Sequence, residues 1–270
     1  LEECIEISKI YSVSRLLSDQ EPLILKRPFR NPHHTVSPQA LAGGGGRPRP
    51  GEISLASGGI LFLDELPEMG REALETLRQP LEERCVTITR LQGAVTYPAN
   101  FQLVAAMNPC PCGHFPDRSR CSCTPAQIRK YLGRISGPLL DRIDICVEAA
   151  PVSYDEIRVN KGGESSASIR SRVARARKLQ ARRFRGLGIR CNAEMTGAMI
   201  RRFCVLDTES ERLLEEVYQT KGMSARTYDR ILKVARTIAD LENEERIRCA
   251  HLYEALSFVS AKEQFWGRQE

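Results

Sequence analysis

The sequence lacks a glycine-rich phosphate-binding loop of the form G-x-x-x-x-G-K-[ST]. The glycines at 43–46 come nearest, but Arg47-Pro48 follow them where Lys and Ser or Thr should stand. It also lacks an apolar run approaching the roughly 20 residues of a membrane-spanning helix. The first residue is Leu1 rather than Met, so the missing signal peptide carries no information. These absences exclude a membrane-spanning helix and leave no phosphate cradle within the 270 residues.

The composition is that of an ordinary soluble protein, with 41% hydrophobic and 27% charged residues. The formal net charge of +6 is compatible with a polyanionic partner. Of the 10 cysteines, six are scattered singly and four are clustered. This usage indicates reduced thiols and one metal site rather than a disulfide scaffold, and we expect a cytoplasmic protein with no membrane partner.

An apolar run at 60–63 leads directly into Asp64 and Glu65. Such a run predicts a strand buried on both faces of a parallel sheet, and the carboxyl ends of these strands are where α/β sheets bind ligands. One carboxylate could hold Mg²⁺, and the other could polarise the water that attacks a γ-phosphate, which is the Walker B pattern. The plain alternative is a buried strand that ends in two solvated acids.

The surrounding pattern predicts further α/β elements. We expect helices at 2–18, 71–79 and 125–136, with Pro80 interrupting the second, and a β-hairpin at 86–97 that turns at 91–93. A second buried strand at 101–107 ends in Asn108, whose amide could hold a water against a phosphate or simply begin a turn before Pro109. A last strand is expected at 143–147.

Four cysteines follow the second strand as two C-x-C pairs, Cys110 with Cys112 and Cys121 with Cys123. Four soft ligands in two pairs can form a tetrahedral site for structural Zn²⁺. The alternative is four thiols in a mobile loop. His114 is interpreted as a bystander, and the adjacent His33 and His34 are interpreted as part of a polar loop because adjacent side chains diverge.

The C-terminal part is predicted to be helical, at 168–185, 193–204, 207–220, 224–242 and 247–259. The first of these helices is strongly basic, which indicates a solvated face or a contact with nucleic acid or a neighbouring subunit. Ser224 can cap the fourth helix, and Arg226 lies in its first turn, where a guanidinium and a helix N-terminus together suit an anion.

The order of these motifs resembles that of AAA+ ATPases of the magnesium-chelatase-related branch, the YifB/ComM family. The strings that carry the resemblance are RPFRNPHH at 27–34, PGEISLA at 50–56, LFLDELPE at 61–68, AAMNP at 105–109, SGPLLDR at 136–142, SAR at 224–226 and FWG at 265–267. The resemblance implies an α/β fold: a parallel-sheet AAA+ core at 1–157, a linker at 158–167 and an all-α lid at 168–270. The core would be incomplete, with its first strand and phosphate loop preceding Leu1.

The resemblance also implies residue roles and cofactors. Asp64 would bind the Mg²⁺ of Mg-ATP, Glu65 would activate the attacking water, and Asn108 would be sensor 1. Arg142 would be the arginine finger that reaches the nucleotide of a neighbouring subunit. Arg226 would be sensor 2 and contact the nucleotide from the lid.

The implied function is that of a C-terminal part of a hexameric ring ATPase that translocates or remodels DNA, inactive as these 270 residues alone. The expected DNA contacts are Arg90 on the hairpin and Arg47 and Arg49 in the glycine-rich segment, because a motor grips the phosphate backbone with cations. Two alternatives stay open: a chelatase-like ATPase subunit that drives metal insertion into a tetrapyrrole, and a non-catalytic zinc-binding interaction module.

Overall fold

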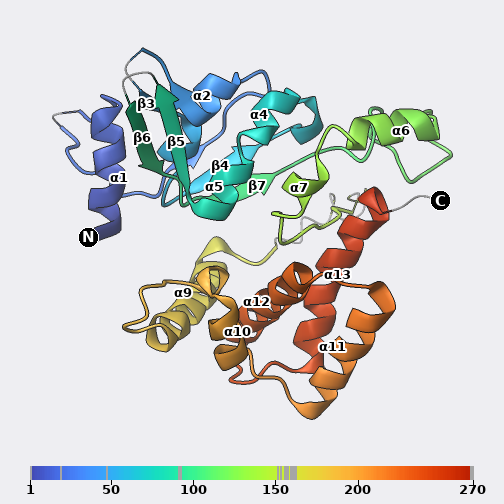
Figure 1. Ribbon diagram of the computed structural model, residues 1–270. Helices are drawn as coiled ribbons and strands as arrows, with labels where there is room; N and C mark the ends of the chain where they lie inside the picture. The colour runs from blue at the N-terminus through green and yellow to red at the C-terminus, as the bar shows by residue number, and fades with distance from the viewer. Residues whose placement is uncertain are drawn as a thin grey trace. The chain divides into compact units, whose positions relative to one another are not determined.

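The computed structural model describes residues 2–18, 20–46, 48–90, 93–150, 152, 154, 158 and 163–267. The chain divides into two compact units, Leu1–Ile143 and Asp144–Glu270 (Figure 1). Of the predicted linker at 158–167, the structure describes residue 158 and residues 163–167, whereas residues 159–162 lie outside the described part. None of the described helices is long and apolar enough to cross a membrane.

The first unit contains a three-stranded parallel sheet in the order β1–β4–β7 (Figure 1). These strands are Phe29–Arg30, Ile60–Leu63 and Gln102–Ala105. In the register, Ile60 pairs with Gln102 and Leu63 with Ala105. Leu61 and Leu63 are fully buried, as the apolar run predicts for a central strand. Gly59 permits the close approach of β1, because a Cβ there would lie 1.9 Å from the carbonyl oxygen of Pro28.

The first unit also contains helices, most of them short. They are α1 (Glu2–Val13), α2 (Pro38–Ala42), α3 (Glu52–Leu55), the 3₁₀ turn η1 (Leu66–Glu68), α4 (Arg71–Glu75), α5 (Arg78–Glu83), α6 (Pro125–Leu132) and α7 (Gly137–Leu140). The helix predicted at 71–79 is two helices, α4 and α5. Pro80 lies in the first turn of α5, where its missing N–H removes no helical hydrogen bond.

Two hairpins pack together in the first unit. The predicted hairpin is confirmed as β5 (Cys85–Arg90) and β6 (Gly93–Pro98), paired from Cys85 with Pro98 to Arg90 with Gly93. Its turn residues 91 and 92 lie outside the described part. The second hairpin, β2 (Gly43–Gly44) with β3 (Arg49–Pro50), was not predicted. The Tyr97 hydroxyl donates to the Pro48 carbonyl oxygen at 2.9 Å and links the two hairpins.

The prediction of a strand at 143–147 is wrong. Residues 143–150, all of which the structure describes, form no strand. The three-stranded sheet is bordered by β1 and β7, and neither edge pairs with this segment. Ile145 is 51% exposed and Val147 is 69% exposed. An apolar run becomes a strand only when it finds a pairing partner and a core to cover, and this one has neither among the described strands.

The second unit is helical, as predicted. It comprises α9 (Ser166–Arg183), the 3₁₀ turn η2 (Asn192–Glu194), α10 (Gly197–Phe203), α11 (Thr208–Lys221), α12 (Ala225–Leu241) and α13 (Cys249–Trp266). Ser224 caps α12 by accepting from the Thr227 N–H at 3.1 Å, as predicted. The apolar stripe of α12 is buried in a core with α10, α11 and α13. The last helix continues past its predicted end at 259.

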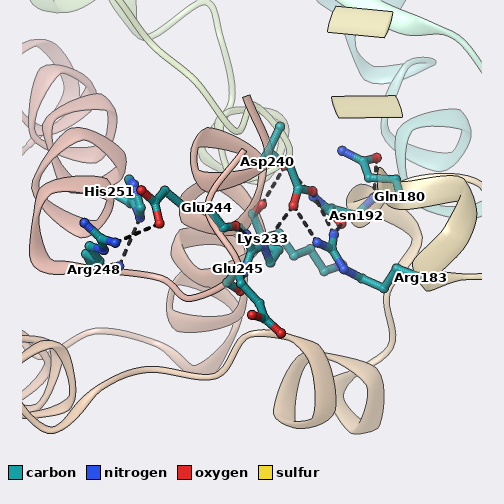
Figure 2. Close-up of polar contacts among 11 residues, drawn as sticks. Gln180, Arg183, Asn192, Lys233, Asp240, Glu244, Glu245, Arg248 and His251 are labelled. Atoms are coloured by element: carbon teal, nitrogen blue, oxygen red, sulfur yellow. Dashed lines mark hydrogen bonds and ion pairs between the residues drawn. The ribbon is translucent and has the colours of Figure 1, made fainter. Parts of the chain in front are cut away.

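A buried polar network fixes α9, η2 and α12 together (Figure 2). Asp240 is fully buried and accepts from both terminal nitrogens of Arg183, at 2.7 and 2.5 Å, and from the Asn192 amide at 2.8 Å. The guanidinium of Arg236, also buried, donates to Asp240 at 3.1 Å and to the carbonyl oxygens of Glu244 and Glu245. Burial alone would raise the pKa of Asp240, but the donors from Arg183 and Asn192 hold that pKa below its usual value.

Candidate active site

Three parallel strands place polar side chains at one edge of the sheet. Asp64 and Glu65 follow β4, Asn108 follows β7, and His34 lies in the segment after β1. The backbone holds this edge together, because the Leu66 N–H donates to the Ala106 carbonyl oxygen at 3.1 Å. The carboxyl ends of parallel strands meet at the same edge, and the predicted Walker B and sensor 1 residues are therefore on neighbouring strands.

The acidic pair adopts an unusual local geometry. The Asp64 carboxylate accepts from the Glu65 N–H at 2.9 Å and is exposed. Glu65 has a positive φ of 51°, a left-handed conformation that costs a non-glycine residue about 1 kcal/mol or more. Strain of this kind is common at functional sites, because the surrounding structure holds a side chain where the chain alone would not put it.

His34 is a candidate site residue that the sequence analysis did not identify. Its Nδ1 lies 2.8 Å from Oε2 of Glu65, so the imidazole holds the carboxylate that was predicted to activate water. His33 points to a different partner, since its Nδ1 contacts the Thr35 hydroxyl at 2.9 Å. From the sequence, both histidines are interpreted as part of a polar loop. The feature that could have identified His34 is its place after β1, which lies beside β4, the strand that leads into Asp64 and Glu65.

Arg142 lies within the first unit and contacts α5. Its side chain is 13% exposed, pairs with the Glu82 carboxylate and donates to the Pro138 carbonyl oxygen at 2.6 Å. Its Nε is buried without a hydrogen-bond partner among the described residues. A finger that reaches a neighbouring subunit would have to leave Glu82. Arg226 is exposed in the first turn of α12 in the second unit.

The four clustered cysteines come together. All four Sγ atoms of Cys110, Cys112, Cys121 and Cys123 lie within 4.8 Å of one another. Cys110 is fully buried and the other three are half-buried. A hydrogen bond from the backbone of His114, assisted by the neighbouring thiols, lowers the pKa of Cys112 to about 6. The cluster offers the donor set that zinc prefers.

Two of the three basic residues predicted to bind DNA lie on the two packed hairpins. Arg90 ends β5 and Arg49 begins β3, and both are exposed. A Cβ on Gly44 would lie 3.0 Å from a terminal nitrogen of Arg90, so the guanidinium lies against the β2–β3 hairpin. Arg47 lies outside the described residues. The structure therefore places Arg49 and Arg90 on adjoining elements.

A pocket of about 410 Å³ lies beside the acidic strand end, between η1 and α6. Arg71, Lys130 and Arg134 line it together with Glu68. Arg134 pairs with Glu68 at 2.7 Å and donates to the Pro67 carbonyl oxygen at 3.0 Å. Burial raises the pKa of the adjacent Tyr131. These contacts anchor α6 to the segment that follows Glu65.

A parallel sheet with an acidic pair at its carboxyl edge, followed by an all-α unit, defines an incomplete AAA+ core and its lid. The sequence model described as magnesium chelatase, subunit ChlI, matches residues 1–157, and the model of the ChlI C-terminal region matches residues 163–259. The chain therefore belongs to the magnesium chelatase ChlI family, in its YifB/ComM branch.

The similar curated proteins are bacterial. The chain is 47% identical over 235 residues to the uncharacterized protein YifB of Salmonella typhimurium, covering 86% of this chain and 45% of that protein. It is 45% identical over 259 residues to the uncharacterized protein YifB of Escherichia coli, covering 95% of this chain and 50% of that protein. It is 46% identical over 235 residues to competence protein ComM of Haemophilus influenzae, covering 86% of this chain and 45% of that protein. The chain spans about half the length of these curated relatives.

Proposed function

We propose that this chain supplies the hydrolytic and sensing residues of a ring ATPase that translocates or remodels DNA. The observation that carries the proposal is the juxtaposition of Asp64, Glu65 and His34 at the carboxyl edge of the parallel sheet. An exposed pair of carboxylates there, one of them held by an imidazole, is suited to hold the Mg²⁺ of Mg-ATP and to direct a water at its γ-phosphate once a phosphate-binding loop is supplied. The family supports the ATPase class.

The donor set at the edge fits the magnesium ion of Mg-ATP. The Asp64 carboxylate is a hard oxygen ligand that is exposed and has no cationic partner within the described part of the chain, and it would hold the ion directly or through water. When bound, the ion would neutralise developing charge on the phosphate oxygens. Glu65 would orient the attacking water and accept its proton, and Asn108 would position that water from the segment that follows β7.

Arg142 and Arg226 complete the proposed machinery in an oligomer, which we propose to be a hexamer. Arg142 would act on the nucleotide of a neighbouring subunit after exchanging Glu82 for phosphate oxygens, which bind a guanidinium more strongly than an exposed carboxylate does. Arg226 would meet the nucleotide from the lid. Both roles require groups that only a nucleotide-bound assembly supplies.

The DNA part of the proposal rests on the two hairpins. Arg49 and Arg90 present exposed cations on two hairpins that contact one another. Contacts to phosphates are independent of sequence, as a translocating motor requires. The formal net charge of +6 favours the same partner.

The test uses the full-length protein and measures DNA affinity against salt together with ATPase rate. Arg90→Ala and Arg49→Ala should each weaken binding equally on unrelated DNA sequences. Each should also reduce the slope of log affinity against log salt by about one unit. Basal ATPase should persist while DNA stimulation falls. Arg129→Ala, an exposed arginine on α6, is the matched control and should change neither quantity. Salt-insensitive or undetectable DNA binding by the intact protein would contradict the proposal.

The second candidate is a chelatase-like ATPase subunit, which the description of the matching family model favours. The same Asp64, Glu65 and Asn108 would hydrolyse ATP, but the work would be insertion of a metal into a tetrapyrrole. In that case DNA should not stimulate the ATPase of the intact protein. Its activity should instead depend on partner chains that bind the tetrapyrrole.

A further inference from the structure

The Cys110–Cys123 loop holds four thiols in a closed cluster. The Sγ atom of Cys110 lies 3.4 Å from that of Cys112 and 3.8 Å from that of Cys121, and the sulfurs of Cys112 and Cys121 are 3.6 Å apart. All four are free thiols. A disulfide would require about 2.05 Å, so the cluster does not consist of bonded pairs.

The spacing matches a tetrahedral metal site. Zinc binds thiolate sulfur at about 2.3 Å, and a regular tetrahedron with that radius has sulfur–sulfur edges of about 3.8 Å. The distances between Cys110, Cys112 and Cys121 agree with that edge to within a few tenths of an ångström. The remaining sulfur, on Cys123, lies within 4.8 Å of the others.

The loop is shaped around these sulfurs. The Phe115 N–H donates to Cys110 Sγ at 3.4 Å, a contact that orients a thiolate ligand. Gly113 turns the chain with a φ of 81°, and Asp117 closes a second turn by accepting from the Ser119 N–H and hydroxyl. Arg118 donates to the Cys123 carbonyl oxygen at 3.4 Å, which brings a positive charge beside a site that would carry net charge −2 with zinc.

The cluster also lies between two parts of the proposed active site. It begins two residues after Asn108, and a Cβ on Gly113 would lie 3.9 Å from the Asn108 amide carbon, so the first turn of the loop rests against that side chain. It ends one residue before Thr124, which caps α6 in a capping box with Gln127. Helix α6 then leads to α7 and Arg142.

We propose that Cys110, Cys112, Cys121 and Cys123 bind one structural Zn²⁺ that fixes Asn108 against the sheet edge and anchors the start of α6. Four sulfurs close the coordination shell, so the ion has no open position and takes no part in chemistry. The metal replaces a hydrophobic core in a loop that buries only Cys110 completely. The positioning role rests on the proposed function of Asn108, whereas the metal site does not.

The first experiment measures metal in the full-length protein, purified under reducing conditions without chelator. We expect about one zinc per chain, with X-ray absorption at the zinc edge showing four sulfur ligands at about 2.3 Å. Cys112→Ser and Cys121→Ser should lose the zinc. Cys146→Ser, a half-buried cysteine in the second unit, is the matched control and should retain it. Substoichiometric zinc, iron in place of zinc, or a mixed nitrogen–sulfur shell would overturn the assignment.

The second experiment follows hydrogen exchange of the wild-type protein before and after a mercurial reagent releases the zinc, in the absence of nucleotide and DNA. Exchange should accelerate over residues 108–124, and the amides of β5 and β6 should keep their protection. Unchanged exchange over 108–124 would overturn the positioning role. Neither experiment depends on ATP turnover or DNA binding, so a failure of the proposed motor function would not be mistaken for the absence of zinc.

Discussion

Replacing Asp240 by asparagine removes one negative charge from the buried network of the helical unit (Figure 2). Asp240 is fully buried and lies between the guanidinium groups of Arg183 and Arg236. The substitution keeps the shape but leaves Arg236, 1% exposed, without a counter-charge. Breaking a buried ion pair by removing one partner costs about 3–5 kcal/mol. We therefore expect the free energy of unfolding of this unit to fall by that amount.

The assay is urea unfolding followed by tryptophan fluorescence, because the single tryptophan, Trp266, lies at the end of α13 and reports on the helical unit. With a denaturant slope of about 2 kcal/mol per molar, the midpoint should shift down by roughly 1.5–2.5 M. Glu216→Gln, an exposed carboxylate on α11, is the control and should leave the midpoint unchanged. A shift for Asp240→Asn no larger than that of the control would refute the reasoning.

The pH dependence gives an independent check on the same residue. The network lowers the pKa of Asp240 in the folded state, so its contribution to stability is complete above the unfolded value of about 3.9. That contribution is lost as the pH falls through the lower native pKa. The wild-type protein should therefore lose stability in acid more steeply than Asp240→Asn does, and parallel acid profiles would contradict the role of the charge.

The remaining predictions concern turnover by the full-length protein. Glu65→Gln should retain nucleotide binding in calorimetry and nearly abolish hydrolysis, because an amide cannot accept the proton of water. Arg142→Ala should reduce kcat by up to about 10³-fold, and mixing it with Glu65→Gln should restore some activity at mixed interfaces; no rescue in intact rings would argue against a finger in trans. His34→Ala should lower kcat by about tenfold with little change in KM, whereas His33→Ala should not, because only His34 contacts Glu65.

Elements defined by burial could be predicted from the sequence. The strand before Asp64 is apolar and buried, the β5–β6 hairpin alternates, and α12 has a capping serine and an apolar stripe; all three are confirmed. The same reasoning failed at 143–147, because an apolar run does not reveal whether a pairing edge exists. It also missed the β2–β3 hairpin, which is held by close backbone contacts at Gly43 and Gly51 rather than by side-chain pattern.

The sequence suggests the candidate site residues one by one, but it does not give the contacts between them. The chemistry of Asp64, Glu65 and Asn108 follows from their places after buried strands, and the cysteine cluster follows from its two C-x-C pairs. The ion pair of Arg142 with Glu82 and the contact of His34 with Glu65 join residues 60 and 31 positions apart in the chain. No periodicity relates such positions, because each residue lies in or beside an irregular segment.

These contacts share a physical feature that bears on mechanism. Glu65 and Arg142 have charged side chains that contact His34 and Glu82, respectively. Each holding contact is partly exposed and therefore weak, of the order of 1 kcal/mol, whereas phosphate oxygens and a bound metal ion offer stronger, charge-assisted partners. If the proposed nucleotide site forms, exchange of these partners for phosphate oxygens or a metal ion is thus energetically accessible. The Asp240 network of the helical unit is by contrast buried, and Asp240 already has two guanidinium groups as partners, so it stabilises its own unit and takes no part in such an exchange.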